Sequence, residues 1–317
     1  MARPGVGVLR SAKLFSAPPG LAQVFYEVIG TAGMTIANAR MYSVSAEAGA
    51  VWRNLLSAII AQAGVPATVI DHPAPAPLEE LWLRNDQAAV FMCGLPYSRA
   101  EPQPVLIAAP IPSPAEFNGM PRYWSDFVVR KGSAFREVRD TFGNRIAFTV
   151  PGSQSGCVAA LTYLMSVHRE APAPPQTPLF SEIIAPTITP MGALTAVVDG
   201  TADIAPIDSY ALRLLGRYRP DLASEVRVVG RTVPTPIPPL VASATAASEK
   251  ERAALQSAFL EAHQNASLKS LMDELLLQRF AHPHPASYDV LRDNFDTAAA
   301  YWRSNRLAAH SHPAFAL

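Results

Sequence analysis

The residues best placed to do chemistry lie in the short segment Gly152-Ser-Gln-Ser-Gly156, which joins an apolar strand to a helix. The first question is whether a serine acts as a nucleophile here. A nucleophile elbow needs the pattern Gly-x-Ser-x-Gly with the serine in the middle, and the middle residue is Gln154. No histidine has an evident partner role either. The pattern therefore argues against a serine hydrolase.

The same turn is also suited to binding an anion. Unpaired backbone N–H groups and about half a positive charge gather at the N-terminus of a helix. The hydroxyls of Ser153 and Ser155 would add donors. The alternative is that one of these serines only caps the helix predicted at 155–168. Both interpretations remain open from the turn alone.

Other motifs for phosphate, nucleotide or metal binding are incomplete. There is no Gly-x4-Gly-Lys-Ser/Thr loop, and Gly5-Val-Gly7 lacks the third glycine of a dinucleotide-binding turn. Histidines occur as His282-Pro-His284 and His310-Ser-His312, in proline-containing segments that favour exposed residues over a metal site. The sequence therefore predicts no metal and no cofactor.

Composition narrows the class of protein. The chain has 317 residues, of which 49% are hydrophobic and 16% charged, and 26 basic residues balance 26 acidic ones. Such a chain is long enough for two lobes or one large domain, and it has no excess of charge that would attract nucleic acid or an anionic membrane. No apolar run reaches the length of about 18–20 residues that a membrane helix needs.

The N-terminus and the cysteines leave the cellular compartment open. The segment MARPGVGVLRSAKLF is basic, but the apolar core of a secretory signal does not follow it. We therefore expect either a cytosolic protein or an export signal that is not visible in this chain. The only two cysteines, Cys93 and Cys157, are too few for a disulfide framework and are interpreted as small buried residues.

Strand and helix patterns alternate from residue 35 onwards. The predicted strands cover 35–42, 67–70, 88–93, 104–109, 126–130, 145–150, 182–185, 203–207, 226–229 and 240–243. The predicted helices cover 46–63, 78–84, 133–140, 155–168, 191–199, 209–216, 249–263, 268–280 and 288–302. This alternation is typical of mainly parallel, helix-covered sheets. Two such series, with the chain returning after residue 233, predict an α/β protein of two lobes with a cleft between them.

Ligands of open α/β sheets bind at the carboxyl ends of the strands. Four candidate segments fall at such ends: Tyr42, the stretch from Cys93 to Tyr97, the turn 152–156, and Asp208. Asp203 and Asp208 flank one short strand, and Asp208 at its end is the better candidate for the cleft. This convergence predicts a binding site between the lobes.

These segments together resemble the phosphonate/phosphate-type substrate-binding proteins of ABC transporters. The resemblance covers about residues 35–265 and rests on motifs that occur in the family's order. They are Met41-Tyr42, Phe91-Met-Cys-Gly-Leu-Pro-Tyr97, Trp124-Ser-Asp-Phe-Val-Val-Arg130, Val150-Pro-Gly-Ser-Gln-Ser-Gly156, Ala196-Val-Val-Asp-Gly-Thr-Ala-Asp-Ile-Ala-Pro-Ile-Asp208 and Thr235-Pro-Ile-Pro-Pro-Leu-Val241.

The resemblance implies a type 2 periplasmic-binding-protein fold, in which two lobes joined by two crossing strands close over a small anion. It divides the chain into an N-terminal extension (1–32), lobe 1 (33–125 and 233–317) and lobe 2 (126–232). It places the ligand-binding roles on the serine turn, on two tyrosines of lobe 1 and on an acidic residue. In this sequence those positions, with the cleft cysteine, are Tyr42, Cys93, Tyr97, Ser153, Gln154, Ser155 and Asp208. We expect both cysteines to be unpaired, because a bridge across the hinge would lock it.

Two positions depart from the family pattern. Gln154 replaces the middle hydroxyl residue of the serine turn, and Pro190-Met191 stands where phosphonate binders often carry a histidine. A different anion or a larger polar solute therefore fits as well as a phosphonate. The resemblance implies a periplasmic, monomeric binding protein that delivers its ligand to an ABC permease. The alternatives are an enzyme on the same fold, acting on a small carboxylate or pyrimidine-precursor substrate, and a cytosolic ligand sensor.

Overall fold

The computed structural model describes residues 35–170 and 178–311. Its strands are β1 (Thr35–Asn38), β2 (Ala67–Val69), β3 (Gln87–Phe91), β4 (Val105–Pro112), β5 (Arg122–Tyr123), β6 (Ser125–Arg130), β7 (Arg145–Ala147), β8 (Phe180–Ile184), β9 (Ile204–Asp208), β10 (Val226–Arg231), β11 (Thr235–Pro236), β12 (Leu240–Ala242), β13 (Leu277–Ala281) and β14 (Ala308–Ser311). Within the described residues, two six-stranded sheets have the orders β13-β4-β12-β3-β1-β2 and β10-β6-β9-β7-β8-β14.

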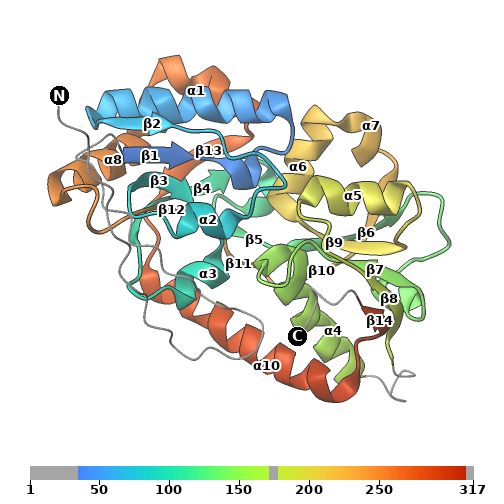
Figure 1. Cartoon of the computed structure of the whole chain (residues 1–317). Coiled ribbons are helices and arrows are strands. Elements are labelled where there is room, and N and C mark those ends of the chain that lie inside the picture. The colour runs from blue at the N-terminus through green and yellow to red at the C-terminus, as the bar shows by residue number, and fades with distance from the viewer. Residues whose placement is uncertain (1–34, 171–177, 312–317) are drawn as a thin grey trace, which may run out of the picture. The chain divides into compact units, whose positions relative to one another are not determined.

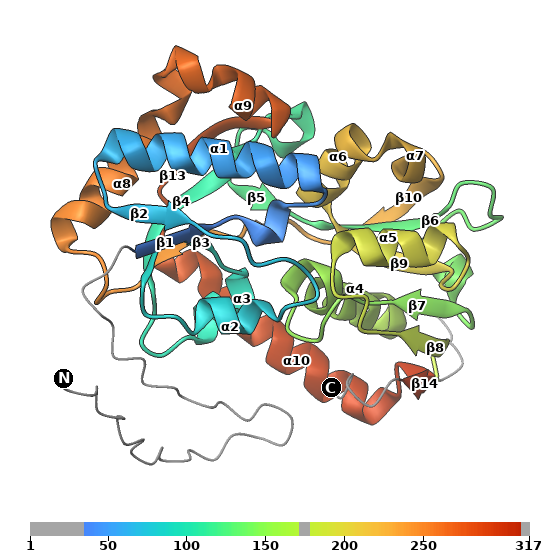
Figure 2. The same cartoon turned by 45° about the horizontal axis from the view of Figure 1, so that its top comes forward.

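Helices cover these sheets, as Figures 1 and 2 show. The α-helices are α1 (Ala46–Ala63), α2 (Leu78–Trp82), α3 (Gly94–Arg99), α4 (Ala159–Arg169), α5 (Pro190–Val198), α6 (Ser209–Tyr218), α7 (Pro220–Ala223), α8 (Glu249–Glu261), α9 (Lys269–Glu274) and α10 (Asp289–Asn305). Shorter helical turns include η1 (Arg40–Tyr42) and the π-helical turn η4 (Gln154–Val158). The two sheets and their helices form the α/β architecture that the sequence predicts.

Local sequence signals explain where the first helix begins and ends. The Ser45 hydroxyl accepts a hydrogen bond from the Ala48 N–H (3.2 Å) at the start of α1, and Gly64 ends the helix with φ 65°. Trp52 and its apolar neighbours at helical spacing are buried against the first sheet. Because β1 and β3 are buried and parallel, their carboxyl ends lie at one edge of that sheet.

Two connecting strands join the sheets. β5 and β11 pair antiparallel, with Tyr123 opposite Thr235, and each leads directly into a strand of a six-stranded sheet. Beside them the buried carboxylate of Asp126 lies 3.1 Å from Arg213 Nη1 and 2.9 Å from Arg231 Nε. The two predicted crossing strands are therefore confirmed. A buried ion-pair cluster stabilises the crossing, because a buried carboxylate needs charged partners.

The structure differs from the sequence prediction in two helices. Only a short turn at Val138–Thr141 occurs where a helix was predicted over 133–140. The helix predicted over 268–280 ends at Glu274, Leu276 takes a positive φ of 52°, and β13 follows. The apolar residues Leu277 and Phe280 have helical spacing, which misled the prediction, but β13 pairs with β4.

The C-terminal strand also lies elsewhere than the division 233–317 implies. β14 pairs parallel with β8 in the second sheet, although residues 240–281 supply strands to the first. Between them α10 packs against both α3 and α4, and Figure 1 shows it running from beside α3 toward β14. The Trp302 indole N–H donates to the Leu161 carbonyl (3.0 Å). The N-terminal extension 1–32 lies outside the described residues.

No helix in the described residues is both long and apolar enough to cross a membrane.

Two helical glycines, Gly192 in α5 and Gly216 in α6, lead to a testable prediction. A Cβ added to Gly192 would lie 2.1 Å from the Thr187 carbonyl oxygen, whereas one added to Gly216 in α6 would meet nothing within 4 Å. Gly192→Ala should therefore lower the free energy of unfolding by about 1–3 kcal/mol. Gly216→Ala should raise it by about 0.5–1 kcal/mol, because alanine favours a helix. Urea denaturation of both variants measures the sign of each change in the free energy of unfolding. A Gly192→Ala variant as stable as wild type would contradict the packing assigned to Gly192.

Candidate functional site

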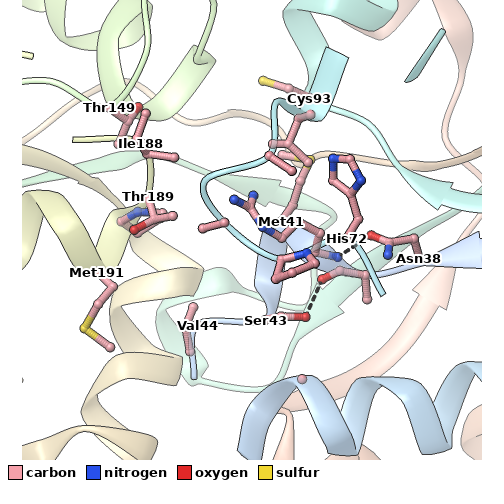
Figure 3. A pocket seen from close by; sticks show the side chains of 18 of the residues that line it. Asn38, Met41, Ser43, Val44, His72, Cys93, Thr149, Ile188, Thr189 and Met191 are labelled. Atoms are coloured by element: carbon pink, nitrogen blue, oxygen red, sulfur yellow. Dashed lines mark hydrogen bonds between the residues drawn. The ribbon is translucent and has the colours of Figure 1, made fainter. Parts of the chain in front are cut away.

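A cavity of about 900 Å³ lies at the strand ends of both sheets. One wall comes from the turn after β1, the proline-rich loop 72–77 and Cys93. The other wall comes from the turn after β7, the loop before α5 and the end of β9. Figure 3 shows Met41 and Cys93 on one side and Thr189 and Met191 on the other. The cavity therefore occupies the interlobe position that the strand-end argument predicts.

The serine turn forms part of this cavity. The Ser153 hydroxyl accepts a hydrogen bond from the Gly156 N–H (3.1 Å), so Ser153 caps η4 as the alternative interpretation expects. Ser153, Ser155 and Gly156 line the cavity, so capping and cavity lining occur together. A Cβ at Gly156 would lie 2.0 Å from Thr149 Oγ1, which explains the glycine at this position.

The Asp208 carboxyl joins the turn to the first lobe. Asp208 Oδ2 lies 3.4 Å from the Ser155 hydroxyl and 3.5 Å from the Tyr42 hydroxyl, both of which donate to it. Its other oxygen, Oδ1, accepts from the Ala211 N–H (2.9 Å) and caps α6. Burial raises the pKa of Asp208 to about 7, although these hydrogen bonds act in the opposite direction. Near neutral pH the buried carboxyl is therefore partly protonated and can donate as well as accept.

Gln154 and Cys93 meet behind the serine turn. The Gln154 backbone N–H donates to Cys93 Sγ (3.4 Å), which links the two lobes. The Gln154 side chain is 1% exposed, does not line the cavity, and has no hydrogen-bond partner among the described residues for either amide atom. Cys93 lines the cavity, and burial raises its pKa to about 11, so the thiol is protonated.

The prediction of two unpaired cysteines is confirmed. Cys93 and Cys157 are both free and buried. Burial also raises the pKa of the Cys157 thiol. Neither thiol has the lowered pKa that a nucleophilic cysteine requires.

The two predicted tyrosines lie outside the cavity lining. Tyr42 is 1% exposed and reaches the site only through its hydrogen bond to Asp208. Tyr97 is equally buried, and its ring packs edge-on against Tyr288 with centroids 5.0 Å apart. Four of the predicted residues therefore line the cavity, and these are Cys93, Ser153, Ser155 and Asp208. A ligand contact by either tyrosine stays a prediction.

Arg40 lines the cavity and was missed by the sequence analysis. Its Nη2 atom is buried and has no hydrogen-bond partner in the described part of the chain, and burial lowers the pKa of the guanidinium. The other arginine of the lining, Arg53, is bonded to Asp71. The signal available in the sequence was its position: Arg40 lies two residues after the end of β1 and two residues before Tyr42, in the same turn.

The described residues contain no set of side chains suited to a metal ion. Residues 35–170 and 178–311 contain no group of three or more His, Cys, Asp or Glu side chains that could hold a metal ion. In the pair His310-Ser-His312, the second histidine lies outside these ranges.

Sequence comparison identifies the family. The family model for the periplasmic phosphonate substrate-binding proteins of ABC transporters matches residues 43–288, which is well over half of the chain. The chain belongs to this family. Its members are periplasmic binding proteins of transporters rather than enzymes. No curated protein matches the chain in sequence.

Solved structures of phosphonate-binding proteins share the fold. A binding-protein component of an ABC phosphonate transporter from Pseudomonas aeruginosa is 16% identical, covers 86% of this chain and 89% of its own, and has a TM-score of 0.72. PhnD1 from Prochlorococcus marinus, solved with methylphosphonate, is 16% identical and has a TM-score of 0.68. The match covers 84% of this chain and 98% of PhnD1. The two-lobed periplasmic-binding-protein fold predicted from the sequence is thereby confirmed.

The buried carboxyl of Asp208 makes stability depend on pH. Its pKa of about 7 in the folded state, against 3.8 ordinarily, means that the folded state holds the proton more tightly. The contribution of Asp208 to stability is therefore present at low pH and is lost as the pH rises from about 3.8 toward 7. We expect Asp208→Asn, which keeps a neutral cap acceptor, to be more stable than wild type at pH 8, with an upper limit of about 4 kcal/mol.

At pH 4.5 the advantage of Asp208→Asn should be much smaller. Urea denaturation at the two pH values measures the difference, with Asp293→Asn on the exposed side of α10 as the matched control. An equal effect of Asp208→Asn at both pH values would rule out the assigned protonation.

Proposed function

We propose that this protein binds a phosphonate or closely related organic oxyanion in the cavity and delivers it to an ABC transporter. The observation that carries the proposal is Arg40, which lines the cavity and whose buried Nη2 atom has no hydrogen-bond partner among the described residues. A partly buried cation without a counter-charge is unfavourable, and an anionic ligand would supply the missing charge.

The opposite wall offers neutral donors suited to the same anion. Ser153, Ser155 and Gly156 line the cavity at the beginning of a helical segment that continues into α4. The Gly156 N–H donates to Ser153 and the Ser155 hydroxyl donates to Asp208, whereas the Ser153 hydroxyl accepts in the first of these bonds and can still donate its own proton to a ligand. Helix N-termini bind anions through their N–H groups. A protonated Asp208 could add a further donor, since its pKa lies near 7. An anion between Arg40 and the serine turn would therefore be bonded by both lobes.

Contacts to both lobes would couple binding to closure. The chain passes between the sheets at the crossing strands β5 and β11, and again through α10, which leads from β13 in the first sheet to β14 in the second. An anion held from both sides favours a closed arrangement through hinge motion at such strands. Ligand contacts from Tyr42, Tyr97 and Gln154, a monomeric state, periplasmic location and delivery to a permease belong to the same proposal, and they rest on family membership.

The proposal predicts a specific effect of Arg40. Methylphosphonate at 100 times its dissociation constant should raise the free energy of unfolding by about 2.7 kcal/mol, seen as a thermal shift. Arg40→Met should weaken binding roughly 10- to 100-fold, the usual effect of losing a hydrogen bond to a charged group. Arg40→Lys, which keeps the charge but not the fork of donors, should fall in between. Titration calorimetry measures all three proteins.

Arg279→Met provides the matched control, because Arg279 is exposed on β13 and outside the cavity. It should bind as wild type does. Wild-type affinity in Arg40→Met would refute the role of Arg40. Failure of the wild type to bind any phosphonate, at millimolar concentration and across pH 5–8, would refute the proposed function.

A further inference from the structure

Much of the cavity wall is apolar. Beyond the polar groups described above, the lining includes the side chains of Met41, Val44, Leu78, Trp82, Ile188 and Met191. Figure 3 shows Ile188 and Met191 on one side and Met41 on the other. A volume of about 900 Å³ lies near the upper end of the range for pockets that take drug-sized ligands. A phosphonate group with a single methyl substituent would leave most of this apolar wall without a contact.

The backbone of Ile188, which belongs to this apolar wall, has an unfavourable conformation. Its φ of 66° lies in the left-handed region, which a β-branched side chain rarely adopts. The backbone is fixed on both sides: the Thr187 N–H donates to the Phe148 carbonyl (3.0 Å) and the Ile188 N–H to the Thr149 carbonyl (3.3 Å). Glycine or asparagine would suit this conformation better. Strained residues cluster at ligand-binding sites, where their side chains have a use.

The same loop also carries Met191 into the wall. The Thr189 hydroxyl accepts from the Gly192 N–H (2.9 Å) and begins α5, which places Met191 in the first turn. Met191 is only partly buried by the protein. A flexible thioether side chain adapts to irregular apolar partners. Ile188 in the loop before α5 and Met191 in the first turn of α5 therefore both present apolar surface to the cavity.

We propose that the ligand is an organic anion with an apolar body larger than a methyl group, such as an aryl- or long-alkyl phosphonate. The acidic group would bond to Arg40 and the serine turn, and the apolar body would contact Ile188, Met191, Met41 and Val44. This inference rests on the proposed function and specifies its ligand class. Burial of roughly 100 Å² of apolar surface corresponds to as much as about 50-fold in affinity.

Titration calorimetry with charge-matched phosphonates tests the inference. Methyl-, phenyl- and hexylphosphonate are compared on the full chain at one pH. We expect phenyl- or hexylphosphonate to bind at least 10-fold more tightly than methylphosphonate. Equal or tighter binding of methylphosphonate would overturn this inference and leave the proposed function standing. Binding of none of the three would overturn both.

Two variants test the wall itself through the ratio of phenyl- to methylphosphonate affinity. Met191→Ala and Ile188→Asn should each lower this ratio about 3- to 10-fold, and asparagine tolerates the positive φ of residue 188. Met120→Ala makes the same change as Met191→Ala at an exposed residue outside the cavity and should leave the ratio as in wild type. An unchanged ratio in both wall variants, with normal unfolding midpoints, would overturn the assignment of Ile188 and Met191.

Discussion

The Asp208 carboxyl group receives hydrogen bonds from three elements that are distant in sequence. Tyr42 comes from the turn after β1, Ser155 from the serine turn, and Ala211 from the first turn of α6. These contacts fix the serine turn relative to the first lobe, so the two cavity walls depend on one buried group. The low dielectric of a buried site strengthens such bonds but also favours the neutral form of the acid.

A second buried acid, Asp126, is stabilised by charged partners instead of neutral ones. Asp126 lies on β6, just after the crossing strand β5, is fully buried, and is paired with Arg213 and Arg231. The Trp124 indole N–H donates to the same carboxylate (2.9 Å). Asp126 therefore contacts full positive charges where the lobes are joined, whereas the described hydrogen bonds to Asp208, beside the cavity, come from neutral donors. Because its partners are neutral, the protonation of Asp208 can change when a charged ligand binds. The ion pairs of Asp126 stabilise the crossing between the lobes.

The sequence was sufficient for the fold and for the position of the site. Alternating strands and helices predicted two α/β lobes, and the residues at strand ends included Ser153, Ser155 and Asp208, which do line the cavity. Strand ends do not reveal side-chain direction, so Tyr42 and Tyr97 were chosen although both are buried behind the wall. β14 was missed as part of the second sheet, because its pairing with β8 joins segments about 130 residues apart and leaves no local pattern.

Arg40 and Ile188 were missed for different physical reasons. An arginine after a strand is ordinarily solvated or paired. Only the packed structure reveals that Arg40 has a buried nitrogen with no hydrogen-bond partner in the part of the chain that the structure describes. The positive φ of Ile188 contradicts its own side-chain preference, so no propensity could predict it. The side-chain amide of Gln154 likewise has no hydrogen-bond partner among the described residues, so local preference and fold disagree at these three positions. All three surround the cavity or the turn that forms it. Such disagreement lowers the stability of the free protein, and at Arg40 it leaves a charged group that a ligand in the cavity can satisfy.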